Sequence, residues 1–247
     1  MSPSILRRLL SLLCLPAAVL ASPPADGTFT VISFGDSTTA SRKNVEPYTF
    51  QLAQRFKSAA AEIRFINRGV PDDNTDRARA RLKTDILDDH PSLVIVQFGL
   101  NDSAIDVWKT PPAEQPRISL KRYEENLTYF VTEIRRSGAD VVLMTPNQLR
   151  WSPVLREKYG RPPYDLNDER GMTRPVAAYA EVVRQIAARL KVTLVDVYAA
   201  YDDWEQRHHE SCSSLMLDGT HPNTQGHALV TDALEPIIAG ALRRPSN

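Results

Sequence analysis

The alternation of short apolar runs with longer helical stretches constrains the fold of this chain more than any other feature of its sequence. The runs are rich in Val, Ile and Leu, which is typical of strands buried on both faces of a parallel sheet. Their order predicts an α/β fold: a three-layer α/β/α sandwich with a five-stranded parallel sheet and right-handed crossovers. The predicted strands are Thr28–Phe34, Ile63–Asn67, Leu93–Phe98, Val141–Thr145 and Thr193–Val197. The predicted helices are Pro47–Ala60, Asp76–Asp88, Leu120–Ser137, Arg174–Leu190 and Gln225–Leu242.

The first 21 residues have the pattern of a secretory signal peptide rather than of the fold. Arg7 and Arg8 precede the apolar stretch Leu9–Leu20, and small residues around Ala21 suit cleavage after that residue. The apolar stretch is shorter than the roughly 18 to 20 residues that span a membrane. We therefore expect a secreted or periplasmic protein without stable membrane insertion.

The remainder, residues 22–247, is long enough for a single domain with its own core. Lys plus Arg and Asp plus Glu each count 30, so the formal net charge is zero. Nothing in this balance favours nucleic acid or an anionic membrane surface as a partner. We expect the domain to act as a monomer.

The two cysteines do not predict a disulfide. Cys14 lies in the predicted signal peptide, and the bulky Leu13 before it disfavours processing as a lipoprotein. Cys212 is then the only cysteine of the mature chain. No basic motif surrounds it, so a packed or loop cysteine is expected rather than a nucleophile.

A serine follows the first predicted strand. Ser37 stands in Phe34-Gly-Asp-Ser37, between that strand and a helix. In open parallel sheets, ligands bind at the carboxyl ends of the strands, so its hydroxyl is placed at the ligand-binding edge. A serine needs a base to become nucleophilic, and a Gly-Asp-Ser tripeptide alone is more often a turn.

A histidine and a carboxylate supply the expected base. Asp218 and His221 lie three residues apart in Leu217-Asp-Gly-Thr-His-Pro-Asn223, after the last strand. One turn can then hold the carboxylate against the imidazole and stabilise the imidazolium. The other histidines lie in helical or charged surface stretches: His90, His208, His209 and His227.

Two further strand ends offer hydrogen-bond donors for a developing oxyanion. Asn101 follows the third strand, and Gly69 follows the second, where its backbone N–H is unobstructed by a side chain. Taken singly, an asparagine such as Asn101 is more often a turn amide, and a glycine such as Gly69 more often forms a tight turn.

Together, these motifs resemble the four sequence blocks of the SGNH hydrolases, also called the GDSL family. The blocks here are Gly35-Asp36-Ser37, Gly69, Gly99-Leu-Asn101-Asp102 and Asp218-Gly-Thr-His221. The resemblance covers the chain from about Thr28 to Leu242. One departure is Thr38, where the family name has leucine.

The resemblance implies a flavodoxin-like fold and serine esterase chemistry without a cofactor or a metal. Ser37 is implied as the nucleophile, His221 as the base and Asp218 as its orienting carboxylate. The backbone N–H groups of Ser37 and Gly69 and the side chain of Asn101 are implied as the oxyanion hole. Asp36 and Asp102 are interpreted as structural carboxylates that brace their loops.

Two long connections leave neighbouring strand ends and are expected to wall the site: Ser103–Ser119 and Pro146–Thr173. Their Trp108, Trp151 and Arg150 are candidate substrate-binding residues, because flat aromatic faces suit a sugar ring and guanidinium groups suit a carboxylate. The alternative is that the aromatics fill small cores of the loops themselves.

The predicted substrate is a small-molecule or polysaccharide ester, with an O-acetyl carbohydrate as first choice. The order Asp-Gly-Thr-His-Pro resembles the rhamnogalacturonan acetylesterase branch of the family. A lipid, lysophospholipid or aryl ester is the alternative substrate. Two other classes stay open: a non-catalytic carbohydrate-binding relative, and a metal-dependent hydrolase built on Asp36, Asp102, Asp218 and His221.

Overall fold

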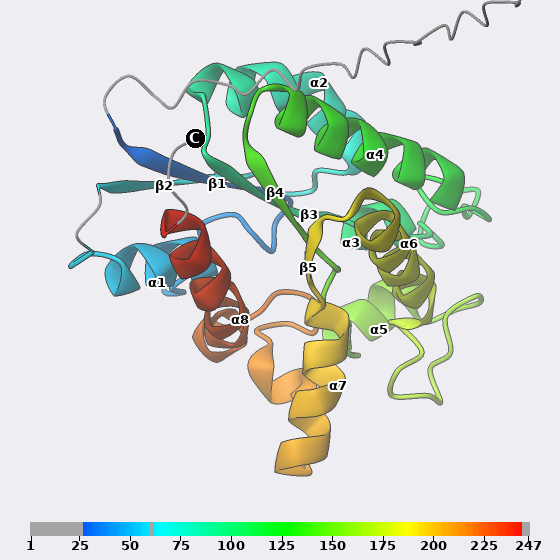
Figure 1. Cartoon of the computed structure of the whole chain (residues 1–247). Coiled ribbons are helices and arrows are strands. Elements are labelled where there is room, and N and C mark those ends of the chain that lie inside the picture. Colours follow the sequence, from blue (N-terminus) through cyan, green and yellow to red (C-terminus); the bar gives the residue numbers. More distant parts are fainter. Residues whose placement is uncertain (1–26, 60–61, 244–247) are drawn as a thin grey trace, which may run out of the picture.

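A computed structural model describes residues 27–59 and 62–243, and the predicted signal peptide lies outside these residues. Within them, five parallel strands form one sheet in the order β2-β1-β3-β4-β5 (Figure 1). Helices cover both faces, so the predicted three-layer α/β/α fold is confirmed. The strands are β1 Phe29–Gly35, β2 Ile63–Gly69, β3 Leu93–Gln97, β4 Asp140–Met144 and β5 Thr193–Val195.

The two central strands are the most buried part of the sheet. Every residue of β3 is buried, and so is every residue of β1 except Phe29. β1 pairs with both β2 and β3, and its last residue, Gly35, lies opposite Gly69 and Gln97. The carboxyl ends of three strands therefore meet at one point of the sheet edge.

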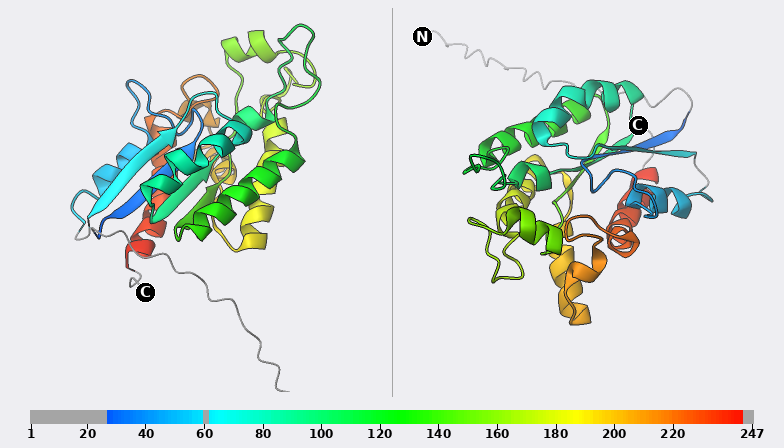
Figure 2. Two further views of the ribbon diagram at one scale, coloured as in Figure 1. Left: turned by 90° about the horizontal axis from the view of Figure 1, so that it is seen from above. Right: turned by 180° about the vertical axis from the view of Figure 1, so that it is seen from behind.

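The helices divide between the two faces of the sheet. α2, α4 and α6 pack on one face, and α1, α7 and α8 pack on the other (Figures 1 and 2). None of the described helices is both long enough and apolar enough to cross a membrane. Their bounds are α1 Tyr48–Arg55, α2 Thr75–Asp85, α3 Leu100–Ser103, α4 Leu120–Arg136, α5 Pro153–Tyr159, α6 Arg174–Leu190, α7 Val197–His208 and α8 Thr224–Leu242.

Helix α4 shows why the sequence forms these elements. Leu127, Phe130, Val131 and Ile134 are buried and recur at the spacing of one helical face. Each such side chain contributes about 1.5–3 kcal/mol when fully buried. Ser119 accepts a hydrogen bond from the first turn and caps the helix.

Helix α7 was not predicted from the sequence. The predicted strand Thr193–Val197 ends at Val195, because Asp196 caps α7 by accepting a hydrogen bond from Ala199 N. The helix buries only three side chains, and its remaining residues are mostly polar, so its pattern resembles a charged surface run.

The two long loops pack against each other beyond the carboxyl edge of the sheet. In the left panel of Figure 2, α5 and the loop after α3 project together from that end. Tyr159 and Tyr164 are buried in a small third core, and the Tyr164 hydroxyl accepts a hydrogen bond from Ile105 N at 2.8 Å. Trp151 packs on this core, and its Nε1 donates to the carbonyls of Asp165 and Asp168. These three aromatics thus support the loops themselves.

Candidate active site

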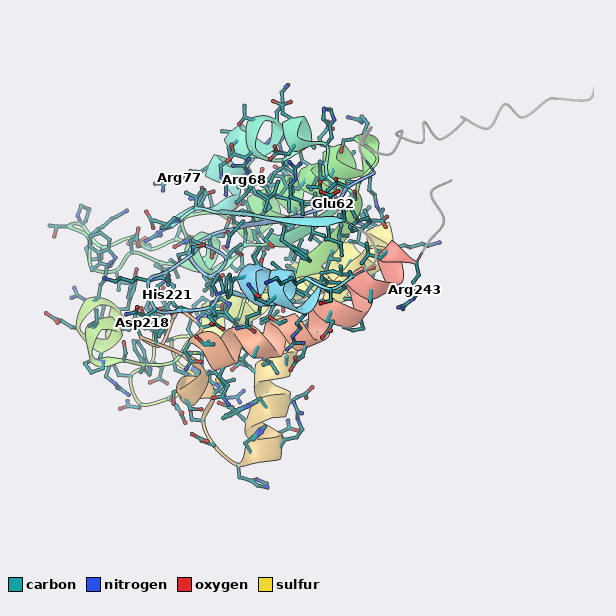
Figure 3. The ribbon with its side chains drawn as sticks, turned by 90° about the vertical axis from the view of Figure 1, so that its left-hand side faces the viewer. Glu62, Arg68, Arg77, Asp218, His221 and Arg243 are labelled. Carbon is teal, nitrogen blue, oxygen red and sulfur yellow. The ribbon has the colours of Figure 1, made fainter. Side chains whose placement is uncertain are left out.

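Ser37, His221 and Asp218 form a continuous chain of hydrogen bonds. The Ser37 Oγ lies 3.0 Å from His221 Nε2, and His221 Nδ1 lies 2.7 Å from Asp218 Oδ2. Figure 3 shows Asp218 and His221 side by side, at the end of the molecule opposite Glu62, which precedes β2. With its Nδ1 hydrogen directed to a carboxylate, an imidazole presents an unprotonated Nε2 to the serine hydroxyl.

The Asp218 carboxylate is held in its ionised form. Partial burial raises its pKa, but hydrogen bonds from the His221 ring and from the backbone N–H groups of His221 and Thr220 outweigh burial and lower the pKa well below its usual range. One side chain therefore both shapes the turn and faces the imidazole.

The segment that follows β4 braces this turn. Gly219 has a φ of 82°, and a Cβ there would lie 2.2 Å from the carbonyl oxygen of Arg150. The Arg150 N–H donates to the Gly219 carbonyl at 2.8 Å, and Asn147 Nδ2 donates to the Thr220 carbonyl at 3.0 Å. Glycine is required at position 219 because the two segments approach so closely.

The turn that carries Ser37 is built on a buried carboxylate. Asp36 Oδ1 accepts from Thr38 N at 2.8 Å and from Thr38 Oγ1 at 2.9 Å. Burial raises the pKa of Asp36 to about 6. The backbone N–H of Ser37 makes no hydrogen bond within the described residues, so it is available to a ligand.

Asn101 lies in the same cavity as Ser37 and His221. Its Nδ2 donates to the Asp73 carbonyl at 2.8 Å, and its Oδ1 accepts from Arg117 at 3.2 Å. The structure thus brings together four of the predicted site residues, from the ends of β1 and β3 and from the loop before α8.

Gly69 does not fit the predicted oxyanion role. Its N–H already donates to Asn67 Oδ1 at 2.9 Å, and it does not line the cavity. A Cβ at this position would lie 2.3 Å from Ala40 N. Gly69 therefore permits the end of β2 to pack against the turn that follows Ser37.

Asp72 lines the cavity instead, and sequence analysis missed it. It has a left-handed backbone with a φ of 60°, and its N–H makes no hydrogen bond within the described residues. The signal in the sequence was the turn-forming stretch Pro71-Asp72-Asp73 after β2, because Asp is one of the few residue types that tolerate this conformation.

The cavity has a volume of about 490 Å³ and a mixed lining. Its polar and charged residues include Ser37, Arg42, Asp72, Asn101, Arg117 and His221. Its apolar and aromatic residues include Leu100, Leu149, Leu155, Tyr159, Met172 and Val176.

The three predicted substrate-binding residues do not line this cavity. The Arg150 side chain is 1% exposed and forms an ion pair with Glu205 at 2.6 Å, so it is unavailable to a ligand. Trp151 belongs to the core of the loops. Trp108 is exposed and lies near the rim, with its ring centroid 4.6 Å from Nζ of Lys158, which does line the cavity.

The residues of the alternative metal site do not gather around one point. Asp102 is fully buried, its Oδ1 accepts from Thr75 N and Oγ1, and burial raises its pKa to about 7. Asp36 instead holds Thr38. Among the residues that the structure describes, no group of three or more His, Cys, Asp or Glu side chains is arranged to hold a metal ion.

Known proteins share both the sequence pattern and the fold. A model of the "GDSL-like Lipase/Acylhydrolase family" matches residues 33–229. An arylesterase of Vibrio mimicus is 30% identical over 231 residues, which cover 91% of this chain and 94% of that protein. The lipoprotein YqeF of Bacillus subtilis is 28% identical over 223 residues, which cover 83% of this chain and 87% of that protein.

Similarity to an acetylxylan esterase is found at both levels. An acetylxylan esterase of Geobacillus stearothermophilus is 26% identical over 174 residues, covering 69% of this chain and 70% of that protein. The crystal structure of the acetylxylan esterase Axe2 from that organism matches with a TM-score of 0.67 and 22% identity, covering 89% of this chain and 95% of the other.

Proposed function

This chain belongs to the GDSL-like lipase/acylhydrolase family and is an ester hydrolase, and we propose that it works through an acyl-enzyme formed on Ser37. The observation that carries this proposal is the hydrogen-bonded chain from Ser37 Oγ through the His221 ring to Asp218 Oδ2. A serine hydroxyl in this position has the base within reach that it needs for attack.

In the proposed reaction, Ser37 Oγ attacks the ester carbonyl while His221 Nε2 takes the hydroxyl proton. Asp218 stabilises the imidazolium, which then gives the proton to the leaving alcohol. Water, activated by the same imidazole, hydrolyses the acyl-enzyme and releases the acid. The backbone N–H groups of Ser37 and Asp72 and the Nδ2 of Asn101 are the proposed donors to the oxyanion.

Replacement of the nucleophile tests this mechanism. We expect Ser37→Ala to lower kcat for p-nitrophenyl acetate by about 10⁴- to 10⁶-fold, with an unchanged circular dichroism spectrum. The wild-type protein should gain the mass of one phosphonyl group on Ser37, with loss of the reagent's leaving group, and should keep its activity in a chelator. Comparable turnover by Ser37→Ala would reject the mechanism.

We propose an O-acetyl carbohydrate as the first substrate class and export from the cytoplasm as the setting. The similarity to an acetylxylan esterase supports the substrate, and the charged residues of the cavity can contact hydroxyl-rich groups. The signal-like pattern of residues 1–21 and the similarity to a lipoprotein support export. We propose that the protein acts as a monomer.

The apolar residues of the cavity favour a second candidate, an ester with an aryl or short alkyl group. The similarity to an arylesterase supports it as well. Turnover of acetylated xylan should be compared with that of phenyl acetate and of p-nitrophenyl esters from acetate to octanoate. A kcat/KM that is highest for the acetylated glycan supports the first candidate, and one that rises with chain length supports the second.

A further inference from the structure

Arg117, in the loop after α3, makes more contacts at the cavity than a surface ion pair requires. Its Nε and Nη2 donate to both oxygens of Asp106 at 2.8–3.1 Å. The Asp106 side chain is 4% exposed and also receives Lys109 at 2.7 Å. A two-point contact with a buried carboxylate fixes the plane of a guanidinium.

The Asp106 carboxylate stays ionised in this position. Burial raises its pKa, but the hydrogen bonds from Arg117 and Lys109 outweigh burial and lower the pKa below its ordinary value. The anchor of the Arg117 guanidinium is therefore charged at neutral pH.

The remaining nitrogen of the guanidinium joins two proposed oxyanion-binding residues. Arg117 Nη1 donates to Asn101 Oδ1 at 3.2 Å and to Asp72 Oδ1 at 3.1 Å. Asn101 Nδ2 donates to the Asp73 carbonyl at 2.8 Å. Rotating this amide by 180° would set its NH₂ against the guanidinium and its oxygen against the carbonyl, and both contacts would repel. The contact with Arg117 thus selects the amide orientation that leaves the second Nδ2 hydrogen available to a ligand.

We propose that Arg117 is a positioning residue that fixes the Asn101 amide and the Asp72 turn for oxyanion stabilisation. The inference rests on the proposed function, because it takes Asn101 and Asp72 as the groups that bind the oxyanion. Arg117 has little capacity to bind substrate itself. The bonds to Asp106, Asn101 and Asp72 leave one Nη2 hydrogen of its guanidinium without a partner among the described residues.

A double-mutant cycle with Asn101→Ala tests this inference. With p-nitrophenyl acetate, we expect Arg117→Met to lower kcat by about 10- to 100-fold, because a small misplacement of a catalytic group has an effect of that size. KM should stay within about twofold, since an oxyanion donor acts on the transition state. In the Asn101→Ala background, the same substitution should lower kcat by a clearly smaller factor, because the amide is gone and only the contact with Asp72 is still lost.

Two further variants separate positioning from folding. Arg117→Lys keeps the charge but loses the two-point contact, so its kcat should lie between those of the wild type and Arg117→Met. Arg184→Met is the matched control for Arg117→Met. Arg184 is also partly exposed and contacts both oxygens of a carboxylate, Asp196, at 2.6 and 3.1 Å, but it does not line the cavity. Arg184→Met should leave kcat unchanged, and the melting temperature of every variant is measured beside its kinetics.

The outcomes distinguish this inference from the proposed function. The positioning role is overturned if Arg117→Met, or Arg117→Lys, lowers kcat by the same factor in the wild type and in Asn101→Ala. An effect confined to KM overturns it as well. A wild-type kcat in Asn101→Ala itself would instead reject the proposed oxyanion site. A loss of kcat that is clearly smaller in the Asn101→Ala background supports the inference.

Discussion

At the scale of single residues, the donor assigned to Gly69 shows what sequence alone misses. A glycine after a strand is the residue type expected to expose its N–H, yet here its N–H is used by Asn67. The donor proposed in its place belongs to Asp72, three residues later, which lines the cavity and whose N–H makes no hydrogen bond within the described residues. Which N–H of a turn points outward depends on backbone angles that residue types only bias. The grouping of Ser37, Asn101, Asp218 and His221 was predictable because each was identified by the chemistry of its side chain.

The left-handed backbone of Asp72 leads to a prediction. Asp72→Gly and Asp72→Asn should keep kcat within about fivefold, since Gly and Asn adopt this conformation routinely. Asp72→Val should lower kcat much further and destabilise the fold by about 1–2 kcal/mol, because a β-branched residue resists a positive φ. Steady-state kinetics and thermal melts check both expectations. The three variants also share the loss of the carboxyl group, so Asp72→Gly and Asp72→Asn control for it.

Asp102 predicts a pH dependence of stability. Burial raises its pKa from 3.8 to about 7, so its contribution to stability is present at low pH and is lost as the pH rises through 7. Asp102→Asn keeps an oxygen for Thr75 and carries no charge. Its melting temperature relative to the wild type should therefore be higher at pH 8 than at pH 5. A difference that is constant between the two pH values would show that the carboxyl group does not titrate in this range.

At the scale of elements, the strands were predictable and helix α7 was not. Each predicted strand begins within one residue of the observed one, because buried parallel strands are marked by continuous apolar runs. Helix α7 buries Val197, Tyr201 and Trp204 on one side only. A sparse apolar face among charged residues gives a weak periodic signal. The residue that caps α7, Asp196, fell within the predicted strand Thr193–Val197.

The loop tryptophans are expected to behave differently from each other. Trp151→Ala should lower the melting temperature and reduce turnover of acetylated xylan and p-nitrophenyl acetate alike, since its indole supports the core of the loops. Trp108→Ala should raise KM for the glycan only, because Trp108 is exposed near the rim. Kinetics on both substrates provide the comparison. Equal effects of Trp108→Ala on the two substrates would argue against a sugar contact.

At the scale of the whole molecule, parallel topology assembles the site. Ser37 and His221 are 184 residues apart in sequence, yet their side chains form a hydrogen bond. Strand order could be anticipated only in outline, but the rule that parallel strands collect their carboxyl ends at one edge was sufficient to group the site. The ion pair of Arg150 with Glu205 was not predictable, because α7, which carries Glu205, was itself missed.

That ion pair predicts a global effect. Glu205 Oε1 contacts Arg150 and accepts from Cys212 N, so it links α7 to segments on either side of it. Burial raises the pKa of Glu205, but these hydrogen bonds outweigh burial and lower it to about 2. Glu205→Gln leaves a buried guanidinium without its counter-charge and should cost about 3–5 kcal/mol of stability. Chemical denaturation measures this cost, and Glu181→Gln, which affects an exposed pair, is the control with little expected change.

The small core shared by the two long loops has a consequence for how such enzymes diversify. The loops pack on each other through Val107, Tyr159 and Tyr164, whereas the proposed nucleophile and base are anchored to the sheet and to the turn before α8. Substitutions among the apolar residues of this core, unlike those of Arg117, can thus accumulate without disturbing bond cleavage. Grafting both loops together from a homologue should transfer substrate preference. Grafting only one of them would pair its apolar residues with a loop that does not fit them and would expose part of the shared core to solvent.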